Sequence, residues 1–141
     1  MKLISEDALA IVTIWQEARG EPYHGKVGVG EVIRNRMETN HFSDGTVAGT
    51  VCAPYQFSGW NQGDPNRIKS LKIDDGDPAV IECIRAWHES GRSNFVNGAV
   101  FYMNVDLVKW NSKGTLPRWW LVDALADGEV KIGDHTFRRK R

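Results

Sequence analysis

The chain lacks the features that mark several large classes of protein. It has no run of 18 apolar residues, so we expect no segment that spans a membrane. It has two cysteines, Cys52 and Cys83, which are too few for a disulfide scaffold. These two could pair, but two small buried side chains are the preferred interpretation. No HxH, HExxH or CxxC spacing, P-loop, dinucleotide fingerprint or G-x-S-x-G motif is present, so we predict neither a metal nor a cofactor.

What the chain does contain is typical of one folded domain. Of its 141 residues, 41% are hydrophobic and 26% are charged, whereas a disordered chain would have fewer apolar residues and a larger net charge. The length predicts a single domain over residues 1–141. The N-terminus lacks the apolar core of a signal peptide, so we expect the protein to be made in the cytoplasm without a signal of its own.

Charge is distributed unevenly along the chain. The formal net charge is zero, but the last four residues, Arg138, Arg139, Lys140 and Arg141, contribute +4, which leaves −4 on residues 1–137. This basic tail could contact an anionic cell envelope, or it could be a frayed, solvated terminus. The rest of the chain has no basic stripe, so nucleic-acid binding is only a weak alternative that depends on the tail.

Apolar periodicity predicts a mainly helical protein. Helices are expected over residues 6–18, 22–37, 46–52 and 78–90. Ser5 is predicted to cap the first helix and Gly20 to end it. The second helix contains three glycines, which indicate close packing against a neighbour: Gly25, Gly28 and Gly30.

The second half of the chain predicts a small β element. Residues 99–103 are β-prone, residues 105–120 are expected to be irregular, and residues 129–132 and 135–138 fit a hairpin with a two-residue turn. The predicted fold class is therefore α+β, mainly helical, with a small C-terminal β-hairpin.

Large aromatic side chains are frequent between residues 55 and 120. Several of them lie beside the amides of Gln56, Asn61, Asn104 and Asn111. Rings that stack on sugar faces next to amides that bond hydroxyl groups favour a polysaccharide cleft, although rings of this kind also fill ordinary cores. The rings in question are Tyr55, Phe57, Trp60, Phe101, Tyr102, Trp110, Trp119 and Trp120.

Glu17 is the strongest candidate for an acid catalyst. It is predicted in the last turn of an apolar helix, where the helix dipole disfavours an anion, and it is two residues from Trp15. Both features should raise its pKa toward the value that a general acid needs near neutral pH. The alternative is a solvated carboxylate that pairs with Arg19 or Lys26. Glu21, four residues on, is expected to support the second helix.

Several blocks of sequence together resemble the spore-cortex-lytic type of cell-wall hydrolase. The blocks occur in the family's order and cover nearly the whole chain, with only the stretch between Gly59 and Ala79 unplaced. They are Glu17-Ala-Arg-Gly-Glu-Pro22, Gly25-Lys-Val27, Val32-Ile-Arg-Asn35-Arg36, Thr46-Val47-Ala-Gly-Thr-Val51, Gln56-Phe57-Ser58, Gly98-Ala-Val-Phe-Tyr102-Met-Asn104 and Ile132-Gly-Asp-His135-Thr-Phe137.

The resemblance implies a lysozyme-like domain, similar to lytic transglycosylases, that cleaves the β-1,4 bond between N-acetylmuramic acid and N-acetylglucosamine in peptidoglycan strands. It makes Glu17 the catalytic acid. Arg19, Asn35 and Arg36 are expected to hold the helix junction together. The expected substrate contacts are Gln56, Phe57, Ser58, Tyr102 and Asn104, with Trp60 added from the same aromatic loop.

One marked acid favours a lytic transglycosylase, which forms a 1,6-anhydro end without water. A glycosidase with two carboxylates would instead place them about 5 to 9.5 Å apart. If Glu21 or Glu31 is the second carboxylate and positions water, the enzyme is a hydrolytic muramidase. The sequence also allows a non-catalytic wall-binding module or a metal-dependent amidase or peptidase.

The biological setting is a hypothesis. A catalytic domain without a signal peptide or wall-binding module suits a monomeric, bacteriolytic phage endolysin. Such a protein would reach the periplasm after release through a holin.

Overall fold

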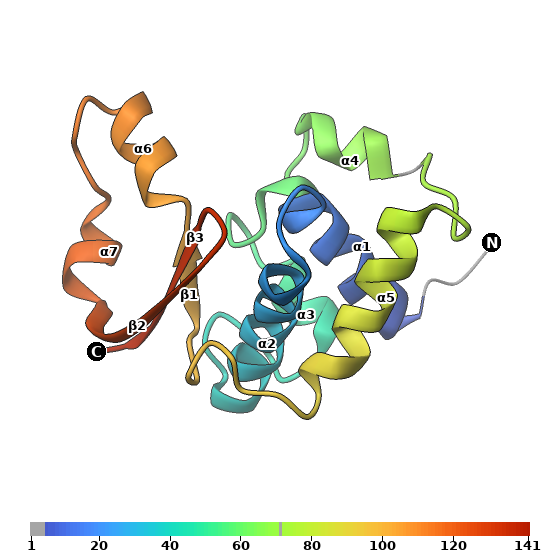
Figure 1. Cartoon of the computed structure of the whole chain (residues 1–141), viewed down its shortest axis with the longest axis horizontal. Coiled ribbons are helices and arrows are strands. Elements are labelled where there is room, and N and C mark those ends of the chain that lie inside the picture. Colours follow the sequence, from blue (N-terminus) through green and yellow to red (C-terminus); the bar gives the residue numbers. More distant parts are fainter. Residues whose placement is uncertain (1–4, 71) are drawn as a thin grey trace.

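The computed structural model describes residues 5–70 and 72–141. Figure 1 shows two lobes, a helical lobe (residues 5–70 and 72–98) and a sheet lobe (residues 99–141). The helical lobe contains α1 (Glu6–Ala18), α2 (Tyr23–Thr39), α3 (Val47–Val51), η1 (Ser58–Trp60), α4 (Pro65–Ser70) and α5 (Pro78–Ser90). The sheet lobe contains β1 (Phe101–Met103), α6 (Val105–Asn111), α7 (Arg118–Val122), β2 (Ala124–Ile132) and β3 (His135–Lys140).

The predicted long helices are confirmed, with one correction at a helix end. Ser5 caps α1 as expected, since its hydroxyl accepts a hydrogen bond from the Ala8 N–H at 3.1 Å. Gly20 does not end α1. Arg19 is the cap residue and keeps a right-handed helical conformation, and its N–H bonds to the Trp15 carbonyl. A glycine in the left-handed conformation is not needed to end α1, because α2 begins almost at once, with Pro22 as its N-cap.

The expectation that residues 105–120 are irregular was wrong, because α6 lies within this stretch and α7 begins in it at Arg118. Every residue of α6 is at least partly exposed, so no apolar periodicity marks it in the sequence. Its start is marked instead by Asn104, whose side chain accepts a hydrogen bond from the Leu107 N–H at 2.9 Å. Local capping thus defines α6 where burial does not.

The sheet is antiparallel with strand order β1-β3-β2. The predicted hairpin is confirmed, although β2 begins at Ala124 and the pairing with β3 shifts between Leu125 and Val130. β3 also pairs with β1, and this register sets Tyr102 opposite Phe137. The C-terminal strand is therefore the centre of the sheet and positions β1.

The basic tail is largely a strand rather than a frayed terminus. Arg138 lies in β3, where its guanidinium stacks over Trp120 at 4.1 Å and pairs with Glu129 at 2.6 Å. Arg139 donates a hydrogen bond to the Asp127 carbonyl at 3.4 Å. Contact of this segment with an anionic envelope stays a prediction.

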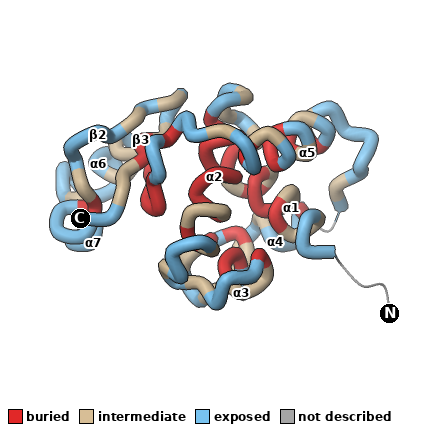
Figure 2. Tube along the Cα trace, turned by 90° about the horizontal axis from the view of Figure 1, so that it is seen from below, coloured by how far each residue is buried: buried red, intermediate tan, exposed pale blue. Residues whose placement is uncertain are grey.

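Apolar packing joins the two lobes. One cluster fills the space between α1, α2, α3 and α5, and a second lies beneath β1 and α7. A third cluster of Val32, Val96, Ala99 and Phe137 packs β3 against α2. Figure 2 shows this buried spine running through α2 toward β3. The position of the sheet lobe therefore depends on α2.

The structure tests the expectations about the two cysteines and about membrane-spanning segments. Cys83 is buried as predicted, but Cys52 is exposed at the end of α3, so the expectation of two buried thiols was wrong for Cys52; neither forms a disulfide. Within residues 5–70 and 72–141, no helix has the length and apolar character needed to cross a membrane.

Two glycines of α2 pack as closely as the sequence predicted. A Cβ atom on Gly28 would lie 2.8 Å from Phe137 Cζ, and one on Gly30 would lie 2.7 Å from Ser90 Oγ. Both distances are too short for a side chain. Glycine therefore lets β3 and α5 approach the α2 backbone, and this contact outweighs its low helix propensity.

We predict that Gly28→Ala lowers the free energy of unfolding by about 1–2 kcal/mol, because the overpacking against Phe137 exceeds the helix propensity gained. Gly20→Ala is the matched control. Its Cβ would meet nothing within 4 Å, so we expect a change within about 0.5 kcal/mol. Urea unfolding measures both values, and equal stability of the two variants would contradict the packing argument.

Candidate active site

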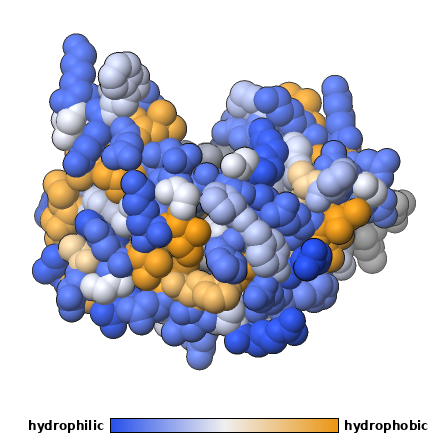
Figure 3. Space-filling view, in the orientation of Figure 1, coloured by the Kyte–Doolittle hydropathy of each residue, from blue (hydrophilic) through white to orange (hydrophobic). Residues whose placement is uncertain are grey.

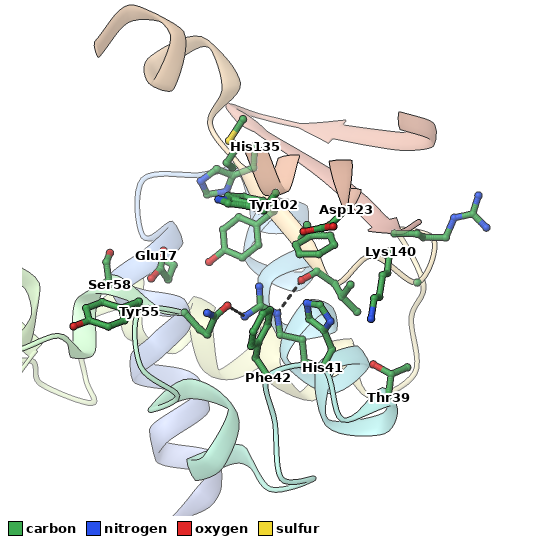
Figure 4. A pocket seen from close by; sticks show the side chains of 18 of the residues that line it. Glu17, Thr39, His41, Phe42, Tyr55, Ser58, Tyr102, Asp123, His135 and Lys140 are labelled. Atoms are coloured by element: carbon green, nitrogen blue, oxygen red, sulfur yellow. Dashed lines mark hydrogen bonds between the residues drawn. The ribbon is translucent and has the colours of Figure 1, made fainter. Parts of the chain in front are cut away.

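A cleft of about 980 Å³ extends from the end of α1 to the end of α2, with the sheet lobe as its second wall. Figure 3 shows the surface hollowed between the lobes, and Figure 4 shows the cleft from close by. The volume is at the upper end of the range for small-molecule sites, which suits an oligosaccharide. Its lining includes Glu17, Arg36, His41, Phe42, Tyr55, Gln56, Ser58, Phe101, Tyr102, Asn104, Trp119, Asp123, His135, Arg139 and Lys140.

Glu17 lies on the cleft wall, half-buried in the last turn of α1. Burial of the carboxyl raises its pKa from 4.5 to about 7, and the nearby negative charge of Asp64 adds to the rise. The direction agrees with the sequence prediction, but the cause differs. Trp15 instead stacks with Arg19, whose guanidinium lies 4.3 Å from the ring. Withdrawal of the carboxyl from water is the main effect.

Three groups around Glu17 oppose this rise. The Tyr102 hydroxyl, the Gly59 N–H and the charge of Arg36 all favour the carboxylate form, so all three lower the pKa of Glu17. Burial beside the Glu17 charge in turn raises the pKa of Tyr102 well above its usual value. Tyr102 therefore keeps its proton and acts as a donor toward Glu17. This environment favours a proton on Glu17 while still accommodating the carboxylate.

Arg36 supports the floor of the cleft. It is buried, and its Nε donates a hydrogen bond to the Val100 carbonyl at 2.8 Å. Its Nη1 lies 3.4 Å from Gln56 Oε1. Desolvation lowers the pKa of Arg36, and the neighbouring side chains of Tyr102 and Glu17 oppose this shift. A buried guanidinium in this position connects α2, β1 and the loop that carries Gln56.

The other two residues assigned to the helix junction also have structural contacts. Arg19 Nη1 donates to the Trp15 carbonyl at 3.3 Å, and its Nη2 donates to Asn66 Oδ1 at 2.9 Å. Asn35 Nδ2 donates to the Ala99 carbonyl at 2.9 Å. These bonds hold α1 to α4 and α2 to the segment that leads into β1.

The structure brings four of the six predicted substrate contacts to the cleft: Gln56, Ser58, Tyr102 and Asn104. It places Phe57 and Trp60 elsewhere. Phe57 is 1% exposed in the helical core, with Arg36 at 5.0 Å from its ring. Trp60 packs against the same core, and its Nε1 donates to Thr13 Oγ1 at 2.8 Å. Both rings therefore stabilise the helical lobe from within.

The two candidate second carboxylates are both engaged by the protein. Glu31 is buried and accepts hydrogen bonds from Ser93 Oγ at 2.7 Å and the Val96 N–H at 3.1 Å. It is absent from the lining of the cleft described above. Glu21 Oε1 accepts a bond from the Asp134 N–H at 2.9 Å and lies 3.5 Å from His135 Nδ1. Glu21 thus holds the β2–β3 turn against the helical lobe.

A smaller depression continues past Glu17 on the side of this turn. Its lining includes Glu17, Gly20, Glu21, Asn104 and His135. Burial lowers the pKa of His135, although Glu21 and Asp134 oppose the shift. The groove available to a polymer therefore extends on both sides of Glu17.

Sequence reasoning missed Asp64, whose charge acts on Glu17, and several residues that line the cleft. Asp64 lies in the stretch that the motif blocks left unplaced, so no spacing pointed to it. His41 and Phe42 follow α2 in a loop where nothing in the local sequence indicates a wall. The sequence marked Lys140 only as part of a charged tail, and its position in the cleft requires the pairing of β3 with β2.

No group of three or more His, Cys, Asp or Glu side chains within the described ranges is arranged to hold a metal ion. The side chains that line the cleft supply carboxyl, phenol, hydroxyl, amide, imidazole, amine and guanidinium groups.

Comparison with known proteins assigns the family. A family model described as Cell Wall Hydrolase matches residues 20–138. The chain belongs to this cell wall hydrolase family. The matched segment begins three residues after Glu17 and so does not include it. The role of Glu17 is inferred instead from the structure and from the resemblance of the block that runs from Glu17 to Pro22.

Relatives of this chain include proteins named spore cortex-lytic enzymes. The enzyme of Oceanobacillus iheyensis is 36% identical over 97 residues, which cover 66% of this chain and 30% of the relative. The enzyme of Bacillus subtilis is 32% identical over 93 residues, covering 66% of this chain and 27% of the relative. The chain thus matches less than a third of the length of these two curated relatives.

A solved structure has the same fold. The catalytic domain of the germination-specific lytic transglycosylase SleB from Bacillus anthracis superposes with a TM-score of 0.69 at 22% identity, covering 97% of each chain. The catalytic domain of the Bacillus cereus SleB protein gives a TM-score of 0.68 at 22% identity, covering 98% of this chain and 93% of that domain. The predicted mainly helical, lysozyme-like class is confirmed. Phage origin, holin release and the monomeric state stay predictions.

The raised pKa of Glu17 predicts a stability change that needs no activity assay. The folded protein binds this proton more tightly than the unfolded chain, so wild type loses stability as pH rises from about 4.5 to about 7. Glu17→Gln does not titrate, so its stability relative to wild type should increase across this interval and level off above it. Urea unfolding from pH 4 to 8 measures the difference. Glu38→Gln, at an exposed position of α2, is the control and should show no such trend.

Proposed function

We propose that this protein cleaves the β-1,4 bond between N-acetylmuramic acid and N-acetylglucosamine in peptidoglycan, as a lytic transglycosylase with Glu17 as its acid. The observation that carries the proposal is the half-buried carboxyl with a pKa of about 7 on the wall of a long cleft. Family membership and the names of the relatives support the substrate class. Periplasmic action on the wall is part of the same proposal.

The first step needs a proton on Glu17. At neutral pH a pKa of about 7 leaves a large fraction of the carboxyl protonated, which is the condition for general acid catalysis. Glu17 donates this proton to the glycosidic oxygen as the bond from the muramic acid C1 breaks. The carboxylate that results is stabilised by the Tyr102 hydroxyl, the Gly59 N–H and the charge of Arg36.

The second step returns the proton. The muramic acid C6 hydroxyl attacks the electron-deficient C1, and Glu17 removes the hydroxyl proton as the new C1–O6 bond forms. The product carries a 1,6-anhydro ring, no water is consumed, and Glu17 regains its starting state. One carboxyl with a pKa near the working pH serves both steps.

Hydrolysis is the alternative outcome, and it needs a second carboxylate to position water. Glu21 and Glu31 bond to groups of the protein, which disfavours both in that role. Asp64 is the remaining carboxylate whose charge acts on Glu17, and its Oδ1 accepts a bond from the Asn66 N–H at 2.8 Å. Binding to the wall does not require a carboxyl that is protonated at neutral pH, whereas general acid catalysis does. The raised pKa of Glu17 therefore favours catalysis over binding alone.

We predict that Glu17→Gln lowers the rate of muropeptide release from purified peptidoglycan by about 100-fold or more, because the amide cannot donate the proton. Mass spectrometry of the muropeptides that the wild-type protein releases should show 1,6-anhydro ends, which are lighter by one water than the ends that hydrolysis would give. Glu38→Gln should release products at the wild-type rate. Full activity of Glu17→Gln would show that the acid is another residue, and hydrolysed ends would show a muramidase.

The neighbours of Glu17 predict opposite shifts in the pH profile. Tyr102→Phe removes a hydroxyl that lowers the pKa of Glu17, so the decline of kcat/KM at high pH should move to higher pH. Asp64→Asn removes a charge that raises this pKa, so the decline should move to lower pH. Rates measured from pH 5 to 9 give both profiles. Shifts in the same direction would contradict Glu17 as the titrating group.

A further inference from the structure

The end of the cleft farthest from Glu17 is lined by aromatic rings, an imidazole and a lysine. We call it the distal subsite and define it by His41, Phe42, Phe101, Trp119 and Lys140, all of which line the cleft. Figure 4 shows Glu17 on one side of Tyr102, with His41 and Lys140 on the other side. The distal subsite is thus in the same cleft as the proposed acid but separate from the bond-breaking position.

Aromatic rings form the wall of the distal subsite. Phe101 and Trp119 stack with centroids 5.5 Å apart, and Trp119 is 39% exposed. Phe42 is 55% exposed and has a φ of 48°, a conformation that a bulky side chain adopts only at a cost. This backbone holds an aromatic ring at the cleft instead of in the core. Exposed rings of this kind fit the apolar faces of a sugar.

The cleft as a whole has more cationic than anionic side chains in its lining, although the chain has a formal net charge of zero. Three cations line the cleft, Arg36, Arg139 and Lys140, against the carboxylates Asp123 and Glu17, of which Glu17 is partly protonated at neutral pH. Among the ion pairs of the described residues, none involves Lys140. Figure 4 shows its side chain directed toward His41.

His41 provides a polar group at the same place. Its ring lies edge-on to Phe42 at 4.6 Å and to Phe101 at 4.8 Å. Burial lowers the pKa of His41 to about 4, with the charges of Arg36 and Lys140 adding to the effect and Asp123 opposing it. The ring is therefore neutral near pH 7. Its Nε2 is buried and has no hydrogen-bond partner among the described residues, which marks a group suited to a ligand or an ordered water.

We propose that the distal subsite binds the carboxylate-bearing substituent of a muramic acid residue in the strand that Glu17 cleaves. The inference depends on the proposed function and adds the part of the substrate that is recognised. Muramic acid differs from N-acetylglucosamine by a lactyl ether, which ends in a carboxylate or carries the stem peptide with carboxylates of its own. The sugar face contacts Phe42 and Trp119, and the carboxylate pairs with Lys140.

Lys140→Gln tests this assignment with substrates that differ in charge. One substrate is peptidoglycan with intact stem peptides, and a second is strands from which an amidase has removed the stems, leaving free lactyl carboxylates. Each is also used after carbodiimide coupling to methylamine, which converts its carboxylates to neutral amides. Lys109→Gln is the matched control, since it removes the same charge from an exposed position of α6.

We expect Lys140→Gln to lower kcat/KM about fivefold on substrates with free carboxylates, as for loss of one partly screened ion pair. Lys140→Arg should restore the rate, and the effect should disappear on the amidated substrates. A lower kcat/KM of Lys140→Gln on the stripped strands would identify the lactyl carboxylate as the group that Lys140 binds. A lower kcat/KM on intact peptidoglycan alone would identify a carboxylate of the stem peptide. Equal rates for Lys140→Gln and Lys109→Gln, or equal loss on amidated strands, would overturn the proposal.

A binding measurement separates this inference from the proposed function. In the Glu17→Gln background, calorimetry with soluble glycan fragments gives the Kd with and without Lys140→Gln. If wild type releases no muropeptides, the proposed function fails, and the binding data still decide the distal subsite. A weaker Kd for carboxylated but not for amidated fragments supports it, and an unchanged Kd for both refutes it.

Discussion

The site depends on one constraint, a carboxyl group kept largely out of water at the end of a helix. Charge on a desolvated carboxylate is costly, so Glu17 binds its proton more tightly than an exposed glutamate would. The protein limits this effect with a phenol, a backbone N–H and a buried guanidinium. The balance keeps the pKa near 7, where one group can both give and take a proton.

This constraint can be met only if the sheet lobe stays in place. Tyr102 reaches Glu17 from β1, β1 is held by β3, and β3 packs on α2 through Phe137. The absence of a side chain at Gly28 makes that packing close enough. The close packing at Gly28 is thus part of the chain of contacts that places Tyr102 beside Glu17.

The cleft combines two kinds of recognition along one groove. Near Glu17 the surrounding groups set the pKa of its carboxyl. At the far end the lining consists of aromatic rings, a neutral imidazole and a lysine that has no ion pair among the described residues. Arg36 lies between the two regions, and its charge influences both Glu17 and His41. A polymer with alternating neutral and acidic sugars would match this change along the groove.

The sequence by itself determined the elements whose signals are local. Apolar periodicity, the Ser5 cap and the hairpin turn predicted α1, α2, α5 and the β2–β3 pair, and the helix end at Glu17 predicted a raised pKa. Only the tertiary structure decided which side chains meet. It buried Phe57, engaged Glu21 and Glu31 with backbone groups, and brought Lys140 into the cleft, because burial and strand pairing join residues that are far apart in the chain.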